Sequence, residues 1–135
     1  KSFGSWAREY RPIYGPLEAG LGRFVDLRKN DFIGRDAVLA AKEAGPTRRI
    51  ATFVVDDNGA DAQGDEPVWH DGKVVGWVTS GGYAHHVGKS VAIGFVPAEL
   101  AGVGDGFAVE ILGERRPARM AREPLFDPKG KRMRG

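Results

Sequence analysis

The chain has 135 residues, 20 of them Gly and 8 Pro, a share that indicates many turns and short elements in one domain, or one domain plus an extra segment. It contains no Cys, which excludes a disulfide framework and a cysteine-ligated zinc site. No apolar run approaches the roughly 18–20 residues that span a bilayer, and the start lacks the apolar core of a signal peptide, so we expect a soluble protein. Because it begins without Met and enters patterned sequence at once, we also expect a fragment of a longer chain.

The net charge of +2 is unevenly distributed. Residues 113–135 carry eight Lys or Arg against three Asp or Glu, a net +5, whereas residues 1–112 are net −3. A basic end of this kind suits a nucleic acid or another polyanion. The alternative is a solvated edge strand followed by a frayed tail. We prefer it because Phe126 is the only aromatic residue among these arginines, which leaves little for base stacking. We therefore predict no nucleic-acid partner and no membrane partner.

The first third of the chain predicts short helical pieces. Phe3, Trp6 and Tyr10 are spaced to lie on one face of a short helix, packed against a neighbour. A further helical turn is expected at Leu17–Leu21 and a strand at Gly22–Val25.

The strongest helix prediction covers Gly34–Ala44. An apolar stripe runs along it, formed by Ala37, Val38, Ala41 and Ala44. Gly45 stands where a left-handed cap would end the helix, and Pro46 forbids its continuation.

From Arg48 onward the pattern is β. The predicted strands are Arg49–Val55, Pro67–His70, Lys73–Ser80, Val91–Val96, Phe107–Leu112 and Arg115–Ala121. Asp71-Gly72 and Gly113-Glu114 predict tight hairpin turns, and Asp56–Asp65 an exposed acidic loop. We expect the strands before and after Gly81–Lys89 to be well buried on both faces, and Gly81–Lys89 itself to be a glycine-rich loop suited to binding. Six or so strands joined by turns predict a small barrel or a two-sheet sandwich.

Two motifs in this loop suggest chemistry that we reject. Gly88-Lys89-Ser90 resembles part of a phosphate-binding loop, but the position five residues before Gly88 is Tyr83 rather than Gly, and a strand pattern follows. His85 and His86 are adjacent, so their side chains point apart and are poor joint ligands for one metal. We interpret them as loop histidines that make hydrogen bonds. The sequence contains no convincing nucleophile and base set.

Three stretches together resemble the glycine-cleavage T-protein (aminomethyltransferase) family. They are PLEAGLGRFVDLRKNDFIGRDAV, GWVTSGGYAHHVGKSVAIGFVP and RRPARMAREPLFDPKGKRMR, and they follow the family's order over nearly the whole chain. Within the family, EYRPIYGPLEAGLG and TSGGYAHHVGKS are most similar to the folate-binding half of dimethylglycine and sarcosine dehydrogenases. The T-protein usually has a Ser-Pro pair after TSG, where this chain has Tyr83-Ala84-His85-His86, and this departure favours the dehydrogenase branch.

The resemblance implies a mainly β fold with one helix in the N-terminal half. Residues 1–46 would be the end of the middle folate-binding domain, and residues 47–135 a C-terminal antiparallel barrel of about six strands. It implies tetrahydrofolate as the acceptor of a one-carbon unit, and FAD in an upstream part that oxidises an N-methyl amine. The family's catalytic aspartate also lies upstream, so we expect no catalytic residue here and an inactive fragment. The expected partners are folate and the upstream domains, in a bacterial cytoplasm or a mitochondrial matrix.

The resemblance also suggests folate-side residues. A basic residue directly before the DFIG-like stretch commonly faces folate, and here that position is Asn30, with Lys29 beside it. Asn30 keeps a donor and an acceptor but lacks the charge and planar fork of arginine. The predicted set is Lys29, Asn30, Trp6, Tyr10, Tyr83 and His85. The alternatives are an ordinary loop before a helix, packing against a neighbour, and hydrogen bonding within a loop.

Other functions stay open. A glycine-cleavage aminomethyltransferase, a demethylase of sulfonium substrates with the same fold, and a non-catalytic docking or capping domain are all compatible with the pattern. The iron–sulfur assembly branch is not, because it carries a Lys-Gly-Cys stretch where this chain has Lys29-Asn30-Asp31-Phe32.

Overall fold

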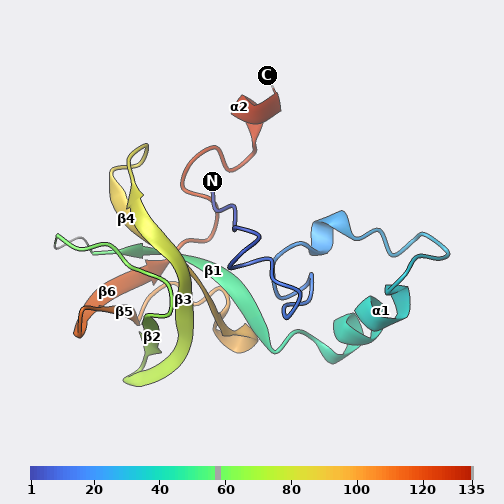
Figure 1. The fold of residues 1–135 in the computed structure, drawn as a ribbon, viewed down its shortest axis with the longest axis horizontal. Coiled ribbons are helices and arrows are strands. Elements are labelled where there is room, and N and C mark those ends of the chain that lie inside the picture. The colour runs from blue at the N-terminus through green and yellow to red at the C-terminus, as the bar shows by residue number, and fades with distance from the viewer. Residues whose placement is uncertain (57–58, 135) are drawn as a thin grey trace.

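Six antiparallel strands form one closed barrel in a computed structural model that describes residues 1–56 and 59–134 (Figure 1). The strand order is β1-β4-β3-β2-β5-β6, and β6 pairs with β1 to close the ring. The elements in chain order are η1 (Gly22–Phe24), α1 (Arg35–Ala44), β1 (Arg48–Val55), β2 (Pro67–His70), β3 (Lys73–Ala84), β4 (Lys89–Pro97), η2 (Ala98–Leu100), β5 (Phe107–Ile111), β6 (Glu114–Met120) and α2 (Lys131–Arg134). The mainly β prediction and the barrel are confirmed, and the sandwich alternative is wrong.

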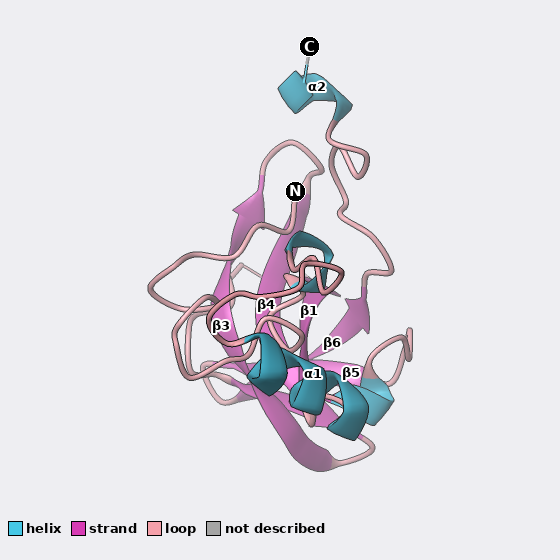
Figure 2. Cartoon of the chain, turned by 90° about the vertical axis from the view of Figure 1, so that its right-hand side faces the viewer, coloured by secondary structure: helices cyan, strands magenta, loops and turns pink. Residues whose placement is uncertain are grey.

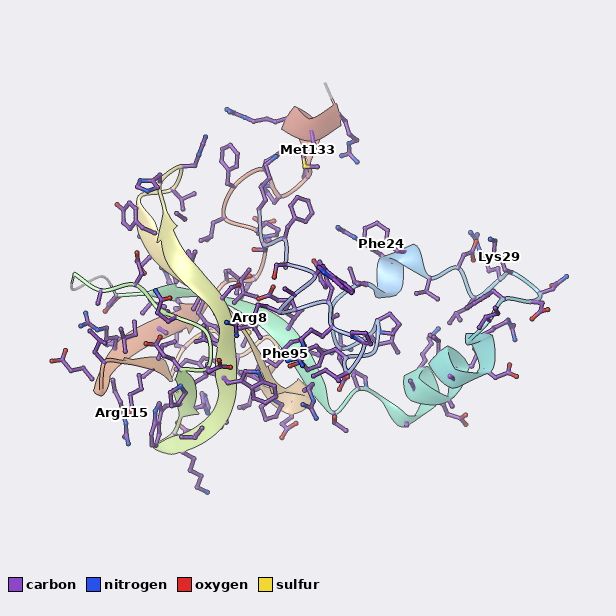
Figure 3. All side chains as sticks on the ribbon, viewed as in Figure 1. Arg8, Phe24, Lys29, Phe95, Arg115 and Met133 are labelled. Carbon is purple, nitrogen blue, oxygen red and sulfur yellow. The ribbon has the colours of Figure 1, made fainter. Side chains whose placement is uncertain are left out.

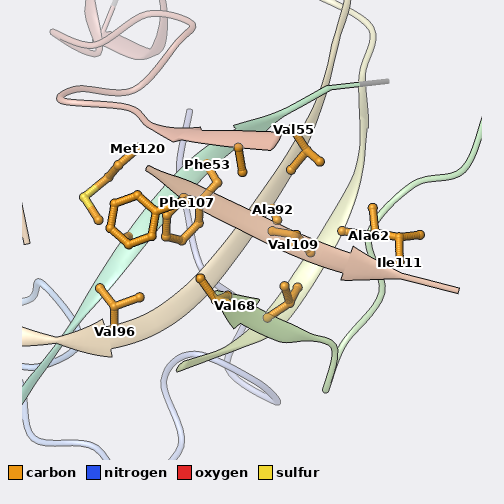
Figure 4. Packing of buried hydrophobic residues seen from close by; sticks show 13 residues of the cluster. Phe53, Val55, Ala62, Val68, Ala92, Val96, Phe107, Val109, Ile111 and Met120 are labelled. Atoms are coloured by element: carbon orange, nitrogen blue, oxygen red, sulfur yellow. The ribbon is translucent and has the colours of Figure 1, made fainter. Parts of the chain in front are cut away.

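Period-two alternation places one face of each strand inside the barrel. In β5, Phe107, Val109 and Ile111 are buried, while the residues between them are partly exposed. The inward side chains meet as one apolar cluster (Figure 4), which includes Phe53, Val55, Val68, Ala92, Val96 and Met120. Burial of each large apolar side chain stabilises the fold by about 1.5–3 kcal/mol relative to its exposure to water. This core therefore holds the barrel together and fixes which residues of each strand face outward.

The two predicted hairpin turns are present, one of them displaced by a residue. Asp71 and Gly72 both have positive φ, 48° and 76°, as the twist of a two-residue hairpin requires. In the second hairpin the positive φ values belong to Leu112 and Gly113, and Glu114 already begins β6. The prediction of a Gly113-Glu114 turn was therefore one residue late.

The predicted loop over Gly81–Lys89 is wrong for most of its length. β3 continues to Ala84 and β4 starts at Lys89, which leaves four residues to make the turn. The prediction of burial on both faces is also wrong at the start of β3, where Val74 is exposed.

The glycines of this stretch serve close packing as well as turning. The β3–β4 register shifts between Val78 and Ser80, so Thr79 forms a bulge and the ladder continues beyond it. A Cβ added at Gly81 would lie 2.4 Å from the carbonyl oxygen of Ala62. Glycine here marks an approach of two backbones, which sequence composition alone does not distinguish from a loop.

The helix α1 starts at Arg35, one residue later than predicted, and ends before Gly45 as expected. Gly34 precedes it with a φ of 86°, and Gly45 follows it with a φ of 76°. No residue of α1 is buried, and Figure 1 shows the helix away from the barrel; Figure 2 views the chain from the side of α1, which stands in front of the strands. Its apolar stripe therefore has no covering partner among the described residues.

Two N-terminal predictions were wrong. Phe3, Trp6 and Tyr10 do not share a helix: the carbonyl of Ser5 accepts from the backbone N–H of Arg8, Glu9 and Tyr10 in one tight turn. The expected strand at Gly22–Val25 is the 3-10 turn η1. Short segments of this kind have little periodicity of their own, so neighbouring structure decides their shape.

Residues 14–21 pack against the barrel. Tyr14 stacks on Phe95 with ring centroids 4.1 Å apart, and the backbone N–H of Ile50 donates to the carbonyl of Glu18 at 2.9 Å. Arg48 pairs with Glu18 at 3.3 Å and lies over the ring of Trp77. These contacts fix part of the segment before α1 on β1 and β4.

Among the described residues no helix combines the length and apolar character that crossing a bilayer demands.

Candidate functional site

A cavity of about 470 Å³ lies between the N-terminal segment, η1, β1 and the chain that follows β6. We call it the main cavity. Its wall carries three aromatic rings, those of Phe3, Tyr10 and Phe24. The barrel contributes Ala51 and Met120, and the volume falls in the range of small-molecule sites. The cavity therefore joins segments that are far apart in the sequence.

Three cationic side chains belong to the lining of the main cavity: Lys1, Arg23 and Arg122. Glu123 is the acidic residue among them, so the charge balance is positive. The guanidinium of Arg23 lies 4.7 Å from the ring centroid of Phe24, which keeps a cation beside an exposed aromatic face. Aromatic walls with a positive rim suit a flat, aromatic and negatively charged molecule.

A second cavity, of about 340 Å³, adjoins the main cavity, and we call it the side cavity. The two share Lys1, Ser2, Thr52 and Ile93, so they form one continuous groove. The hydroxyl of Thr52 donates to Ser2 Oγ at 3.0 Å in the shared part. The rest of the side cavity comes from the β3–β4 turn and the C-terminal segment.

The C-terminal segment is fastened over the side cavity by charge and ring contacts. Lys1 Nζ donates to Asp127 at 3.1 Å, and the rings of His86 and Phe126 lie 4.7 Å apart. Burial raises the pKa of Asp127, but hydrogen bonds from Lys1 and the backbone of Arg132, together with the charge of Lys1, lower it below its ordinary value. The first and last parts of the chain therefore meet at this groove.

The structure brings only some of the predicted site residues together. Tyr10 lines the main cavity and His85 the side cavity. Tyr83 contacts His85 edge to face, with centroids 5.0 Å apart, so these two lie together at the end of the β3–β4 hairpin. Trp6 is 75% exposed and lines neither cavity.

Lys29 and Asn30 lie in the exposed loop before α1. Figure 3 shows Lys29 well away from Phe95 on the barrel. Arg35 holds this loop in shape, because its Nε donates to the carbonyl of Lys29 at 2.9 Å and its Nη2 to that of Leu27 at 3.3 Å. Arg35 thus holds the backbone of Lys29, while Lys29 and Asn30 are both exposed and neither lines the groove.

Several groove residues were not predicted as site residues. Phe24 was expected in a strand, and Lys1, Arg23 and Arg122 were counted only as charges. They come from three separated segments, and no short motif joins them, so only the fold reveals their proximity. The cations at 113–135 also do not form one solvated edge, because β6 pairs on both sides and Arg116 is 8% exposed.

A fully buried carboxylate, that of Glu9, directly precedes Tyr10 of the main cavity in the chain. Glu9 has 0% exposure and accepts from the Ser80 hydroxyl at 2.6 Å and from the Ser5 backbone N–H at 2.5 Å. Burial raises its pKa, but hydrogen bonds from Ser80, Thr79 and the backbone outweigh this and lower it below the ordinary value. In the part of the chain that the structure describes, no group of three or more metal-binding side chains comes together.

Comparison with known proteins decides the family. The glycine cleavage T-protein C-terminal barrel domain matches residues 48–127. The chain belongs to this family. A solved structure of the glycine cleavage system aminomethyltransferase T from Bartonella henselae superposes with a TM-score of 0.76 at 24% identity, covering 87% of this chain and 33% of that one. It shows that the two share a fold.

Relatives of two kinds are similar to this chain in sequence. Dimethylglycine dehydrogenase of Mus musculus, a mitochondrial protein by its name, is 43% identical over 126 residues, which cover 93% of this chain and 14% of that protein. The aminomethyltransferase of Desulfitobacterium hafniense is 35% identical over 125 residues, which cover 93% of this chain and 34% of that protein. The T-protein barrel chain thus spans about a seventh to a third of the relatives that it matches.

Proposed function

We propose that this T-protein barrel chain is the C-terminal part of a tetrahydrofolate-dependent dimethylglycine or sarcosine dehydrogenase. It would help to bind the folate that accepts a one-carbon unit from an oxidised N-methyl amine, giving 5,10-methylenetetrahydrofolate. The observation that carries the proposal is the main cavity, with aromatic walls and a positive rim, in a chain similar to dimethylglycine dehydrogenase over 93% of its length.

The lining residues fit the chemistry of tetrahydrofolate. Phe3 and Tyr10 offer rings against which a pterin or an aminobenzoyl group can pack, and Arg122 offers a partner for carboxylates. Bound tetrahydrofolate would supply the nitrogen atoms that accept the one-carbon unit. The residues of this chain would bind and orient it, and exclude water from one side.

The predicted folate-side residues stay part of the proposal in different roles. Tyr10 would pack in the main cavity, while Tyr83 and His85 would act at the side cavity. Lys29 and Asn30 would reach folate from their own loop once upstream domains enclose it.

The remainder of the enzyme is assigned to upstream domains. They would hold FAD, the catalytic aspartate and the first part of the folate-binding domain that residues 1–46 complete. The uncovered apolar stripe of α1 and the exposed side chain of Ile33 suit contact with such a domain. The compartment would be the mitochondrial matrix in a eukaryote, or the cytoplasm in a bacterium.

Titration with tetrahydrofolate tests the proposal. The chain should bind it saturably, and the full-length protein should give more 5,10-methylenetetrahydrofolate from dimethylglycine as tetrahydrofolate is added. The 135-residue chain alone should not turn over dimethylglycine. Absence of any tetrahydrofolate effect on either protein would reject the assignment.

Two further functions have support of their own. The chain is 35–41% identical to aminomethyltransferases, which supports a glycine-cleavage enzyme or a related folate-dependent demethylase. Activity of the full-length protein without an oxidisable N-methyl amine would favour either of these two over the dehydrogenase. The exposed apolar side chains of Trp6, Ile13 and Phe24 support the second function, a docking or capping module. Tight binding to upstream domains, unaltered by tetrahydrofolate, would favour that module.

A further inference from the structure

The turn at residues 5–10 is fixed to the barrel through the buried carboxylate of Glu9. Its two oxygens have separate tasks: Oε1 accepts from Ser80 on β3, and Oε2 accepts from the backbone of Ser5 within the turn. Ser80 stands directly after the β3 bulge, which turns its hydroxyl toward the N-terminal segment. Among the described residues no Lys or Arg forms an ion pair with Glu9, so neutral donors hold the charge. The position of the turn therefore depends on these hydrogen bonds.

The same turn carries one wall of the main cavity, Tyr10, and lies against the backbone beside a second, Phe3. Tyr10 follows Glu9 directly, and its hydroxyl accepts from the backbone N–H of Gly4 at 2.9 Å. A Cβ added at Gly4 would lie 2.6 Å from Glu9 Cβ, so the backbone beside Phe3 rests against Glu9. Both Phe3 and Tyr10 line the main cavity, whereas Glu9 has no surface there. Any movement of Glu9 would therefore move both rings.

We propose that Glu9 is a positioning residue for ligand binding in the main cavity: it ties the rings of Phe3 and Tyr10 to Ser80 of the barrel. The ligand part of this inference rests on the proposed tetrahydrofolate function. Arg8, next to Glu9 in the chain, pairs with Asp65 at 3.3 Å, while the Ser80 hydroxyl on the barrel donates to Glu9 at 2.6 Å. Glu9 and Ser80 are consequently the pair through which the turn can be tested.

The test compares Glu9→Gln and Ser80→Ala with the wild type. Glu9→Gln removes the carboxylate charge, so that weaker neutral hydrogen bonds replace the charge-assisted ones to Ser80 and Ser5, and Ser80→Ala removes the barrel partner. Tetrahydrofolate binding is measured by calorimetry, and the ring signals of Phe3 and Tyr10 by NMR. We expect the Kd to rise about tenfold in Glu9→Gln, with both rings shifting together. The double variant should lose less affinity than the sum of the two single losses, because both changes act on the contact between Glu9 and Ser80. Glu99→Gln on exposed η2 is the matched control and should change neither reading.

The outcomes separate the two claims. If the wild type binds tetrahydrofolate while both variants bind it equally well and the rings do not shift, the positioning role is overturned and the proposed function stands. If the wild type does not bind tetrahydrofolate but the rings of both variants shift together, the positioning role holds and the proposed function fails. If Glu9→Gln does not fold, Ser80→Ala decides, since it leaves the Ser5 contact intact.

Discussion

At the scale of single residues, Gly81 and Glu9 show how close packing is maintained where β3 meets its neighbours. The Cα of Gly81 faces the carbonyl of Ala62, with no room for a side chain. Glu9 fills the adjoining contact with Ser80 and leaves no water-exposed surface. Both positions are therefore constrained by geometry, and each gives a sharp prediction.

Replacing Gly81 with Ala should lower the free energy of unfolding by about 1–3 kcal/mol, because the new Cβ would lie 2.4 Å from the Ala62 carbonyl oxygen and the backbone cannot yield freely. Urea unfolding followed by circular dichroism measures the change. Gly104→Ala is the control: no atom lies within 4 Å of a Cβ there, and its φ is not positive. An equal effect of both substitutions would show that the Ala62 contact is not the cause.

Stability should depend on pH through Glu9. The pKa of Glu9 is lower in the folded state than its ordinary value of 4.5. Its ionised carboxylate therefore contributes fully to the free energy of unfolding above pH 4.5, and this contribution is lost as the pH falls through the folded-state pKa. Glu9→Gln should therefore unfold more easily than the wild type at pH 7, by about 1.5–3 kcal/mol. The difference should shrink below pH 4.5. Urea unfolding at several pH values measures it, and a constant difference would mean that the charge of Glu9 is not involved.

At the scale of elements, the strands were largely predictable because each alternates between the core and the outside. Pro67–His70 was predicted to the residue, and Asp71-Gly72 was located from residue type alone. The failures follow from contacts between distant segments. The end of β3 was predicted as a loop because glycine is compatible both with a turn and with close packing of two backbones. The 3-10 turn η1 was predicted as a strand because three residues are too few to show a hydrophobic periodicity.

The strand β6 illustrates a second limit of sequence reasoning. Its arginines were treated as one solvated group, yet Arg116 points inward where the alternation places it. Its Nε and Nη1 have no hydrogen-bond partner among the described residues, and its Nη2 donates to Glu114 at 3.3 Å. A buried donor without a partner costs about 1–3 kcal/mol, so this side chain lowers stability.

Replacing Arg116 with Leu should therefore raise the free energy of unfolding by about 1 kcal/mol, because it removes unsatisfied donors and adds apolar contacts within the barrel. Thermal unfolding measures the change. Arg119→Leu, at an exposed position of the same strand, is the control and should stay within about 0.5 kcal/mol of the wild type. A loss of stability in Arg116→Leu would mean that the guanidinium is satisfied in solution.

At the scale of the whole molecule, the groove shows why the site was harder to predict than the fold. Tyr10 and His85 were predicted, and they lie in its two connected parts. Lys1, Phe24 and Arg122 were not, because the groove arises where the first and last segments of the chain cross the barrel. Neither composition nor spacing reports such a crossing. The two segments are joined to each other by the contact between Lys1 and Asp127, and the first is joined to the barrel by that between Ser2 and Thr52.

The same crossing bears on the boundary expected between residues 46 and 47. Residues 14–21 cover part of the barrel, since Tyr14 stacks on Phe95 and Glu18 bonds to Ile50 and Arg48. A shortened chain of residues 47–135 would expose one face of Phe95, which is 0% exposed here. Losing a buried aromatic partner costs about 2–3 kcal/mol.

We therefore predict that residues 47–135 unfold at lower urea concentration than residues 13–135, with a difference of about 2–3 kcal/mol in the free energy of unfolding. Tyr14→Ala in the full 135-residue chain is the matched variant and should reproduce much of that loss, while Tyr83→Ala, on the exposed end of the β3–β4 hairpin, should not. If residues 47–135 prove as stable as the longer chain, the barrel folds independently of the segment before it. In that case the contacts of Tyr14 and Glu18 would serve only to orient that segment beside the groove.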